Sequence, residues 1–432
     1  MRKIDSLIGN LVVLALAFFL IHEFIYYNVY LYGNMDTAFQ LDFDYSFDVA
    51  TFMGQENGTL GYTMLGVYIC LIIAIFLFIS HYKVHKGLAI LWIGMCLWCL
   101  VTLAHSAEPF LYVSGITALS NTMAPGTVAL MSCALLFTKQ AVWEQFSKNI
   151  KYVIIFAFIL SVYGFIHFPY SFDENNQILR LFSFKWIKGP VGCLMLLLPF
   201  AYTFYNQKNC KFQTVIFVMA FIGAILMQSR MSIISLFVMY FLMNYMVKDN
   251  NAVPDPVRKN IQFIYKIMVF FVTIVLIYML FDSLISIFNI NNKFLNIFFD
   301  RVSDDTRSSQ YINHLPIVLQ SLPMGIGYPS TSVLRDYASY GIDNGLLMMM
   351  YYCGLPMLIL FVAYTYPPVI KAVRLKGIQM EDISIITIGL GRLIWLLSSF
   401  TPSLSIGLVM LMVAVGRSKY LLDIDSIRRN GW

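Results

Sequence analysis

Two arginines and one aspartate in this sequence have the chemistry needed to handle a phosphorylated substrate: Arg230, Arg307 and Asp343. A guanidinium group stays charged at physiological pH and binds phosphate oxygens through two parallel N–H groups. A carboxylate accepts the proton of a hydroxyl group or orients that group for attack. We expect the three residues to share one external membrane face, where the arginines bind a diphosphate and the aspartate faces a hydroxyl.

Each of these residues also has an ordinary structural interpretation. Arg230 can be an interfacial residue whose charge reaches the membrane surface, and Arg307 can be an ion-pair partner of Asp304 or Asp305 on a helix surface. Asp343 can cap the apolar helix that follows it. The sequence leaves these alternatives open.

Further polar residues are candidates for substrate binding. Arg180 or Arg301 would assist in binding the anion, and His314 is an alternative base. The ring of Tyr328 offers a platform for a sugar ring, or else it belongs to the aromatic belt at a membrane interface. The candidate substrate-binding residues are Arg180, Arg301, Tyr311, His314, Tyr328 and Asn344.

Most of these candidates lie in a long connection, residues 290–343, which we expect to be a large external loop. Within it the pattern predicts a helix over about 306–322, with the polar candidates on one side of the helix. The turn-rich stretch Leu-Pro-Met-Gly-Ile-Gly-Tyr follows at 322–328. We expect Gly325 and Gly327 to occupy turn or close-approach positions.

The composition predicts the framework that must position this loop. Of the 432 residues, 59% are hydrophobic and only 12% are charged, about half the charge content of ordinary soluble domains. A membrane-spanning helix needs about 20 apolar residues. Twelve apolar runs are interpreted as membrane spans, at residues 8–27, 60–80, 87–105, 118–138, 152–168, 189–205, 213–228, 231–247, 261–289, 344–366, 383–400 and 404–416.

We therefore predict an all-α, polytopic integral membrane protein with about twelve transmembrane helices. Residues 1–432 would form a single transmembrane domain into which the loop 290–343 is inserted. The first run has no cleavage site and is expected to remain in the chain. Most of the 29 lysines and arginines lie in segments that would be on the same side of the membrane as the N-terminus. The positive-inside rule therefore predicts that both termini are cytoplasmic. These basic loops explain the net charge of +6 without nucleic-acid binding.

Two charged positions interrupt the apolar pattern. Arg230 lies in the short break between the runs 213–228 and 231–247, which form either a tight external hairpin or a broken pair of short helices. Arg392 lies within the run 383–400 and is expected to face the protein interior. It would either line a groove for a lipid or pair with Asp282.

The seven cysteines fall mainly in or beside apolar runs. We expect them to be small apolar core residues. Cys96 and Cys99 are three residues apart, but no histidine or carboxylate accompanies them, so the sequence predicts no metal site. We expect no cofactor.

Several of these motifs together resemble the O-antigen polymerase and ligase superfamily of bacterial inner-membrane proteins. The resemblance lies in Ser229-Arg230 between two short apolar runs, in Arg307 before the turn at 322–328, and in Asp343-Asn344 before an apolar helix that contains Gly354-Leu355-Pro356. Arg180-Leu181 followed by Gly189-Pro190 is a weaker element. Together the motifs cover residues 178–365 approximately, and their order and spacing are more specific than any single motif.

The resemblance implies a metal-independent glycosyltransferase of the membrane-embedded class with a GT-C-like fold. Its substrates would be a donor and an acceptor glycan, each linked to undecaprenyl diphosphate, and its site would face the periplasm. Ligases usually have His-Asn where this chain has Asp343-Asn344, which favours the polymerase branch. The resemblance also implies a chain-length regulator as a partner, beside the lipid bilayer itself. An O-antigen ligase and a lipid-linked oligosaccharide flippase or transporter are the alternatives.

Overall fold

The computed structural model describes most of the chain as helices. The described residues are 2–25, 59–106, 125–167, 171–173, 178–180, 190–204, 211–226, 230–285, 315–328, 345–396 and 405–429. The long helices are α1 (Arg2–Ile25), α5 (Thr59–His81), α6 (Lys86–Ala104), α11 (Gln140–His167), α15 (Asp255–Ile285), α19 (Gly345–Ala372) and α21 (Ile406–Arg429). The shorter ones are α9 (Pro125–Leu130), α10 (Cys133–Leu136), α12 (Pro190–Ala201), the 3₁₀ helix η3 (Tyr202–Phe204), α13 (Lys211–Leu226), α14 (Arg230–Val247) and α20 (Met380–Leu396).

These helices make the protein a helical membrane protein. Within the described residues, five helices are long and apolar enough to cross a membrane: Lys3–His22, Tyr62–His81, Lys86–Ala104, Gln140–Tyr163 and Gly345–Ala372. Each of the twelve predicted apolar runs overlaps a helix or, at 118–138, a pair of helices. A hydrocarbon environment favours helices because every backbone N–H and C=O group is then satisfied within its own segment.

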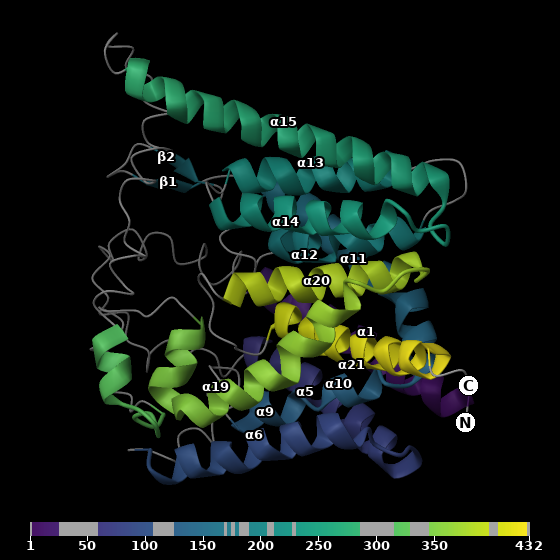
Figure 1. Ribbon diagram of the computed structural model, residues 1–432, viewed down its shortest axis with the longest axis vertical. Helices are drawn as coiled ribbons and strands as arrows, with labels where there is room; N and C mark the ends of the chain where they lie inside the picture. The colour runs from purple at the N-terminus through teal and green to yellow at the C-terminus, as the bar shows by residue number, and fades with distance from the viewer. Residues whose placement is uncertain are drawn as a thin grey trace.

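The helices run nearly parallel to one another in a bundle (Figure 1). The helix α15 lies along one edge and α6 along the other. Both termini lie at one end of the bundle (Figure 1). α20 and the first part of α21, from Ile406 to Ser418, are buried on almost all sides. They pack against each other and against α19, so they form the centre of the bundle.

The opposite end of the bundle carries a small hairpin that the sequence pattern does not predict. The strands β1 (Ser171–Asp173) and β2 (Ile178–Arg180) pair antiparallel, with Ser171 opposite Arg180. Each strand has three residues, which is too short for an alternating pattern to be recognised. The prediction of an all-helical chain therefore needs this one addition.

The apolar run at 118–138 was predicted to be one helix, and this prediction is wrong for its described part. A turn at Met131 and Ser132 separates α9 from α10. The Tyr364 hydroxyl donates to the Met131 carbonyl at 3.0 Å, and the Trp92 Nε1–H donates to the Val128 carbonyl at 2.9 Å. A break is tolerated because side chains of neighbouring helices bind the carbonyl groups around it.

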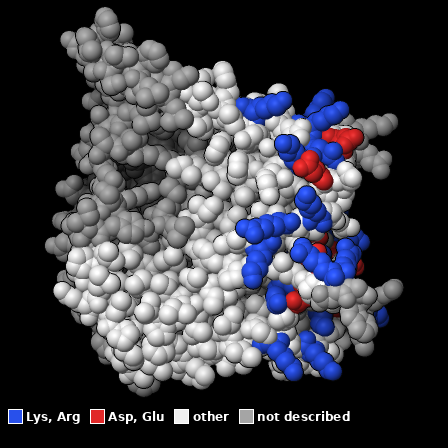
Figure 2. Space-filling model, viewed as in Figure 1, with Lys and Arg blue, Asp and Glu red and all other residues white. Residues whose placement is uncertain are grey.

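Basic side chains gather at the end where the termini lie (Figure 2). The connections 82–85 and 373–379 carry lysine or arginine, and so does the last turn of α21. We call this the basic end. Here Tyr82 donates a hydrogen bond to Asp5, and burial together with this bond raises the pKa of Tyr82 to about 12.

A buried ion pair holds three helices together at the basic end. Arg417 of α21 donates to both carboxylate oxygens of Asp382 on α20, at 2.7 and 3.3 Å, and to Oε1 of Gln140 on α11, at 2.6 Å. Its guanidinium also lies over the rings of Trp143 and Tyr420, 5.0 and 4.7 Å from their centroids. Both charged side chains are about 95% buried, with 4% and 5% exposed. Such a complete set of partners is what a buried charge requires.

Candidate functional site

The structure describes only part of the candidate set. Arg230 is the first residue of α14, and Arg180 is the last residue of β2. Their backbones are described, but their side chains are not. Tyr328 is described together with its side chain. The remaining candidates lie outside the described residues, and these are Arg301, Arg307, Tyr311, His314, Asp343 and Asn344. Whether Arg230 and Arg307 converge therefore stays a prediction.

Arg230 is placed by a tight helical hairpin. α13 ends at Leu226 and α14 begins at Arg230, and the two helices pack against each other. They lie side by side in the bundle (Figure 1). Of the two arrangements that the sequence left open, the hairpin is the one observed. The backbone of Arg230 lies at the beginning of α14, where free N–H groups and the helix dipole favour a nearby anion.

The turn at 322–328 fits into a break in α19, and we call this interlocked unit the clasp. α19 contains non-helical backbone at Gly354. The N–H groups of Ile326 and Gly327 donate to the carbonyls of Tyr351 and Tyr352 at 2.9 and 3.0 Å. In return, the N–H of Leu355 donates to the carbonyl of Pro323 at 2.9 Å. The two stretches of the resemblance that contain glycine and proline are thus one structural unit.

Glycine is required on both sides of the clasp. Gly325, Gly327 and Gly354 have φ angles of 78, 82 and 77°, which L-residues with a Cβ rarely adopt. A Cβ on Gly325 would lie 2.5 Å from the Tyr352 carbonyl oxygen, and one on Gly354 would lie 2.3 Å from that of Pro323. The prediction that Gly325 and Gly327 are turn and close-approach positions is confirmed.

The end of α6 forms the third part of the clasp. The Trp98 Nε1–H donates to the carbonyl of Cys353 at 2.6 Å, which satisfies a carbonyl beside the break in α19. The backbone N–H of Tyr328 donates to Ser106 Oγ at 2.8 Å, and the Tyr328 hydroxyl lies 3.0 Å from Cys99 Sγ. The stretch 322–328 is therefore fixed to α6 as well as to α19.

Tyr328 has a different place from the one that the sequence suggested. Its side chain is 1% exposed, and burial raises the pKa of its hydroxyl well above the ordinary value. No ring face is open to a sugar in this arrangement, because the ring packs inside the clasp. The interpretation of Tyr328 as a stacking platform is therefore corrected: it anchors the loop.

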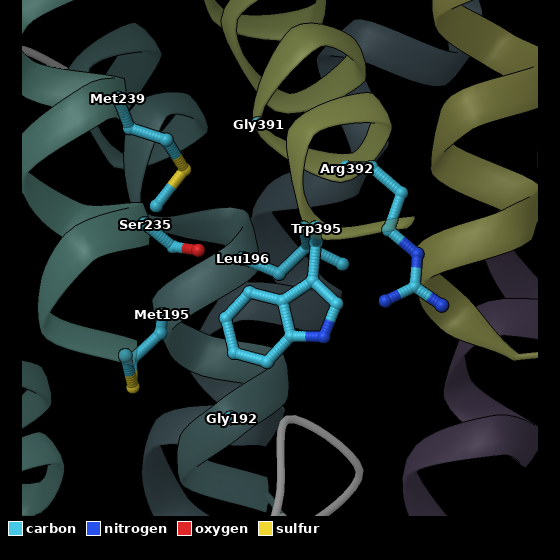
Figure 3. A pocket seen from close by; sticks show the side chains of 8 residues that line it. All are labelled: Gly192, Met195, Leu196, Ser235, Met239, Gly391, Arg392 and Trp395. Carbon is cyan, nitrogen blue, oxygen red and sulfur yellow. The ribbon is translucent and has the colours of Figure 1, made fainter. Parts of the chain in front are cut away.

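A narrow pocket lies between α12, α14 and α20 (Figure 3). Each helix presents residues spaced three or four apart, which share a helix face. The cavity volume of the pocket is about 20 Å³, little more than one water molecule requires. Its lining residues are Gly192, Met195, Leu196, Ser235, Met239, Gly391, Arg392 and Trp395.

Arg392 is the one charged residue that lines this pocket. It is 3% exposed, which confirms the expectation that it faces the interior. Its guanidinium points away from Ser235 and Met239 (Figure 3). A Cβ on Gly407 of α21 would lie 2.8 Å from Arg392 Nε, so the glycine makes room for the guanidinium. The side chain of Asp282, the alternative partner, is not described.

The burial of the described cysteines agrees with the expectation that they are small apolar core residues. Five of them are buried and Cys96 is partly buried, all as free thiols. Within the described part of the chain, no group of three histidine, cysteine or acidic residues is arranged to hold a metal ion.

The sequence analysis did not identify the partners that hold the clasp together. Trp98, Ser106 and Cys353 act through single hydrogen bonds to groups far away in the sequence. The one available signal was the cluster of glycines and prolines on both sides of the loop, since such residues mark close backbone approach.

Comparison with known proteins adds nothing to this picture: no family model matches the chain, and neither a curated protein nor a solved structure is similar to it.

Proposed function

We propose that this protein is a polymerase of surface polysaccharide that joins oligosaccharide repeat units carried on undecaprenyl diphosphate. The observation that supports the proposal most is the clasp. The stretches 322–328 and 351–356, which carry the resemblance to O-antigen polymerases, are bonded to each other through their backbones. Two motif segments that are far apart in the sequence must lie close together if they are to form one site. The clasp holds these two segments together.

The proposed orientation follows from the distribution of charge. The basic end, which holds both termini, would lie in the cytoplasm, in agreement with the positive-inside rule. The opposite end, with the clasp and the backbones of Arg180 and Arg230, would then face the periplasm of a bacterial inner membrane. In this arrangement the twelve predicted runs span the bilayer, and residues 290–343 form the large periplasmic loop.

In the proposed reaction, a hydroxyl of the acceptor glycan attacks the anomeric carbon of the donor. The bond between that carbon and the diphosphate oxygen breaks, and lipid diphosphate leaves with the electron pair. Arg230 and Arg307 stabilise the charge that develops on it, an effect worth roughly 3 kcal/mol for one such donor. Asp343 accepts the proton of the hydroxyl, and direct displacement inverts the anomeric carbon.

The test is complementation of a deletion strain. We expect the deletion to leave a single repeat unit on the surface lipid, and the wild-type gene to restore long polymer. Arg230→Ala and Arg307→Ala should each fail to restore it while the protein stays in the membrane in normal amount. Arg307→Lys should also fail, because lysine cannot make the two-point contact.

The matched control is Arg374→Ala, which removes an exposed arginine from the basic end and should restore wild-type polymer. Wild-type polymer length with Arg230→Ala would overturn the assignment. A deletion strain that accumulates polymer on its carrier would indicate a ligase instead. Repeat units trapped inside the cell would indicate a flippase.

A further inference from the structure

We propose that the face shared by α1 and α11 binds a second copy of this chain, so that the protein is a symmetric dimer in the membrane. The proposal does not depend on the proposed function. It starts from three amide side chains on this face, Asn10 of α1 and Gln145 and Asn149 of α11, which we call the amide patch. Gln145 Nε2 and Asn149 Nδ2 donate to Asn10 Oδ1 at 3.1 and 2.6 Å, and both hydrogen bonds are exposed.

The amide patch lies where lipid would otherwise cover the protein. Its three residues belong to α1 and α11, within the parts of these helices that are long and apolar enough to cross a membrane. Leu7 and Leu14 share the side of α1 that carries Asn10, and each of them is 47% exposed. Lipid tails offer no hydrogen-bond partner, so amides in such a place favour contact with another helix.

The three amides use only part of their hydrogen-bonding capacity. Within the described residues, no group accepts a hydrogen bond from Asn10 Nδ2, and none donates to Gln145 Oε1 or Asn149 Oδ1. One helix therefore presents donors and the other presents acceptors. A face that carries both is complementary to itself, which is what a two-fold interface between identical copies requires. Turning all three amides over exchanges donors and acceptors and leaves this complementarity intact.

The heights of the amides in the membrane also suit a second copy. α1 and α11 both begin at the basic end, where the N-terminus lies and where Gln140 binds Arg417. A two-fold axis along the membrane normal keeps every residue at its own height. The bonds to Asn10 hold the three amides at nearly one height. Asn10 of each copy can therefore meet Gln145 and Asn149 of the other.

The amide patch is also held in place before any partner arrives. α1 and α11 pack along each other, and Gly9 allows their close approach, because a Cβ there would lie 3.0 Å from the Val142 carbonyl oxygen. The hydrogen bonds to Asn10 fix the side chains of the patch. Side chains that are already ordered lose little conformational freedom on association, which favours dimerisation.

A lipid headgroup is the competing occupant of this face. The phosphate and ester oxygens of a phospholipid accept hydrogen bonds but donate none. They match the donors of Asn10 and leave the acceptors of Gln145 and Asn149 without partners. A second copy satisfies the donors and the acceptors together, and for this reason we commit to it.

The first test counts dimers of the full-length protein in liposomes by single-molecule photobleaching over a range of protein-to-lipid ratios. We expect a monomer–dimer equilibrium. Asn10→Leu should weaken dimerisation at least about tenfold, because each copy loses hydrogen bonds across the interface. The matched control is Thr273→Leu, which removes an exposed hydroxyl from α15, at one edge of the bundle (Figure 1). It should change the dissociation constant less than about twofold.

The second test keeps all three amides intact. Leu14 of α1 and Tyr152 of α11 lie one turn beyond the amide patch and are 47% and 60% exposed. Two differently tagged copies, one with Leu14→Cys and the other with Tyr152→Cys, should be joined by a short bismaleimide in the membrane. The control pair combines Leu14→Cys with Ile274→Cys, at an exposed position of α15. It should give no more product than the unsubstituted chain.

A protein that stays monomeric at every protein-to-lipid ratio would overturn the proposal. So would a dimer that Asn10→Leu leaves unchanged, or cross-linking that is no stronger for the Leu14 and Tyr152 pair than for its control. Phospholipid that is retained by a monomeric wild type and lost from Asn10→Leu would identify a headgroup as the occupant and refute the dimer. If Asn10→Leu does not fold, the cross-linking decides, because it leaves the amides in place.

Discussion

The two ends of the helical bundle are held together by different kinds of contact. At the basic end, a charged pair joins α20 and α21: Arg417 binds Asp382 and Gln140 and lies over two aromatic rings. At the clasp, the contacts between 322–328 and α19 are backbone N–H groups and carbonyls, and glycine allows them to approach. No hydrogen bond described for the clasp involves a charged side chain.

Under the proposed function, this difference separates the charges that hold the fold from the charges that bind the substrate. The charges of the pair at the basic end are already used to hold the helices together, so they are not available to a ligand. The described contacts of the clasp are made by neutral groups, and none of them uses an arginine side chain. A membrane protein that must bind an anion at one end gains from such a division, because the binding charges need not also hold the fold.

The largest expected effect comes from the clasp. Gly354→Ala should destabilise the folded protein by more than about 5 kcal/mol, because the new Cβ would lie 2.3 Å from the Pro323 carbonyl oxygen and φ is unfavourable for alanine. Unfolding of purified protein in detergent measures the change. Gly377→Ala is the matched control: φ is 69° there too, but nothing lies within 4 Å of a Cβ. We expect it to cost about 1–2 kcal/mol. Equal losses in the two variants would show that close approach at the clasp is not what matters.

The next largest effect is expected at the basic end. Arg417→Leu should lower the free energy of unfolding by about 4 kcal/mol, because Asp382 is then a buried charge without its partner. Replacing Asp382 by leucine as well should recover about half of this loss or more, since a pair of apolar residues has no charge to desolvate. The double-mutant cycle in the same unfolding assay checks this. A double variant less stable than Arg417→Leu alone would argue against a mainly electrostatic contact.

The smallest effect tests a single hydrogen bond of the clasp. Ser106→Ala removes the acceptor of the buried Tyr328 N–H and should cost about 2 kcal/mol. Ser80→Ala is the matched control. Ser80 Oγ and Ser106 Oγ each donate to the carbonyl of the residue four positions earlier, but Ser80 is exposed. We expect a change within about 0.5 kcal/mol for it. Thermal unfolding monitored side by side would reveal whether the bond to Tyr328 contributes.

Much of the framework could be predicted from the sequence. The apolar runs mark the helices because each segment's preference for lipid depends on its own composition, and the hairpin at Arg230 follows from the short break between two runs. Gly325 and Gly327 were predicted because the need for positive φ is local. The prediction failed at 118–138, where Tyr364 and Trp92, far away in sequence, satisfy the carbonyls of a broken helix.

The candidate site was less predictable. Tyr328 was assigned to substrate binding because a tyrosine near a membrane surface is an apt platform for a sugar. Its exposure depends on α6 and α19 packing around it, and no local pattern encodes that packing. The pocket beside Arg392 is a similar case, since its walls come from three helices separated by up to about two hundred residues.

By itself, the sequence determined that this chain is a bundle of membrane helices with one basic end, and it determined where glycine permits sharp turns. These properties follow from the composition and the backbone preferences of short segments. Only the tertiary structure decided that 322–328 fits the break in α19, that Arg417 meets Asp382, and that α12, α14 and α20 leave a pocket between them. Each of these contacts joins groups from distant segments, and the energy of such a contact exists only when packing has brought both partners together.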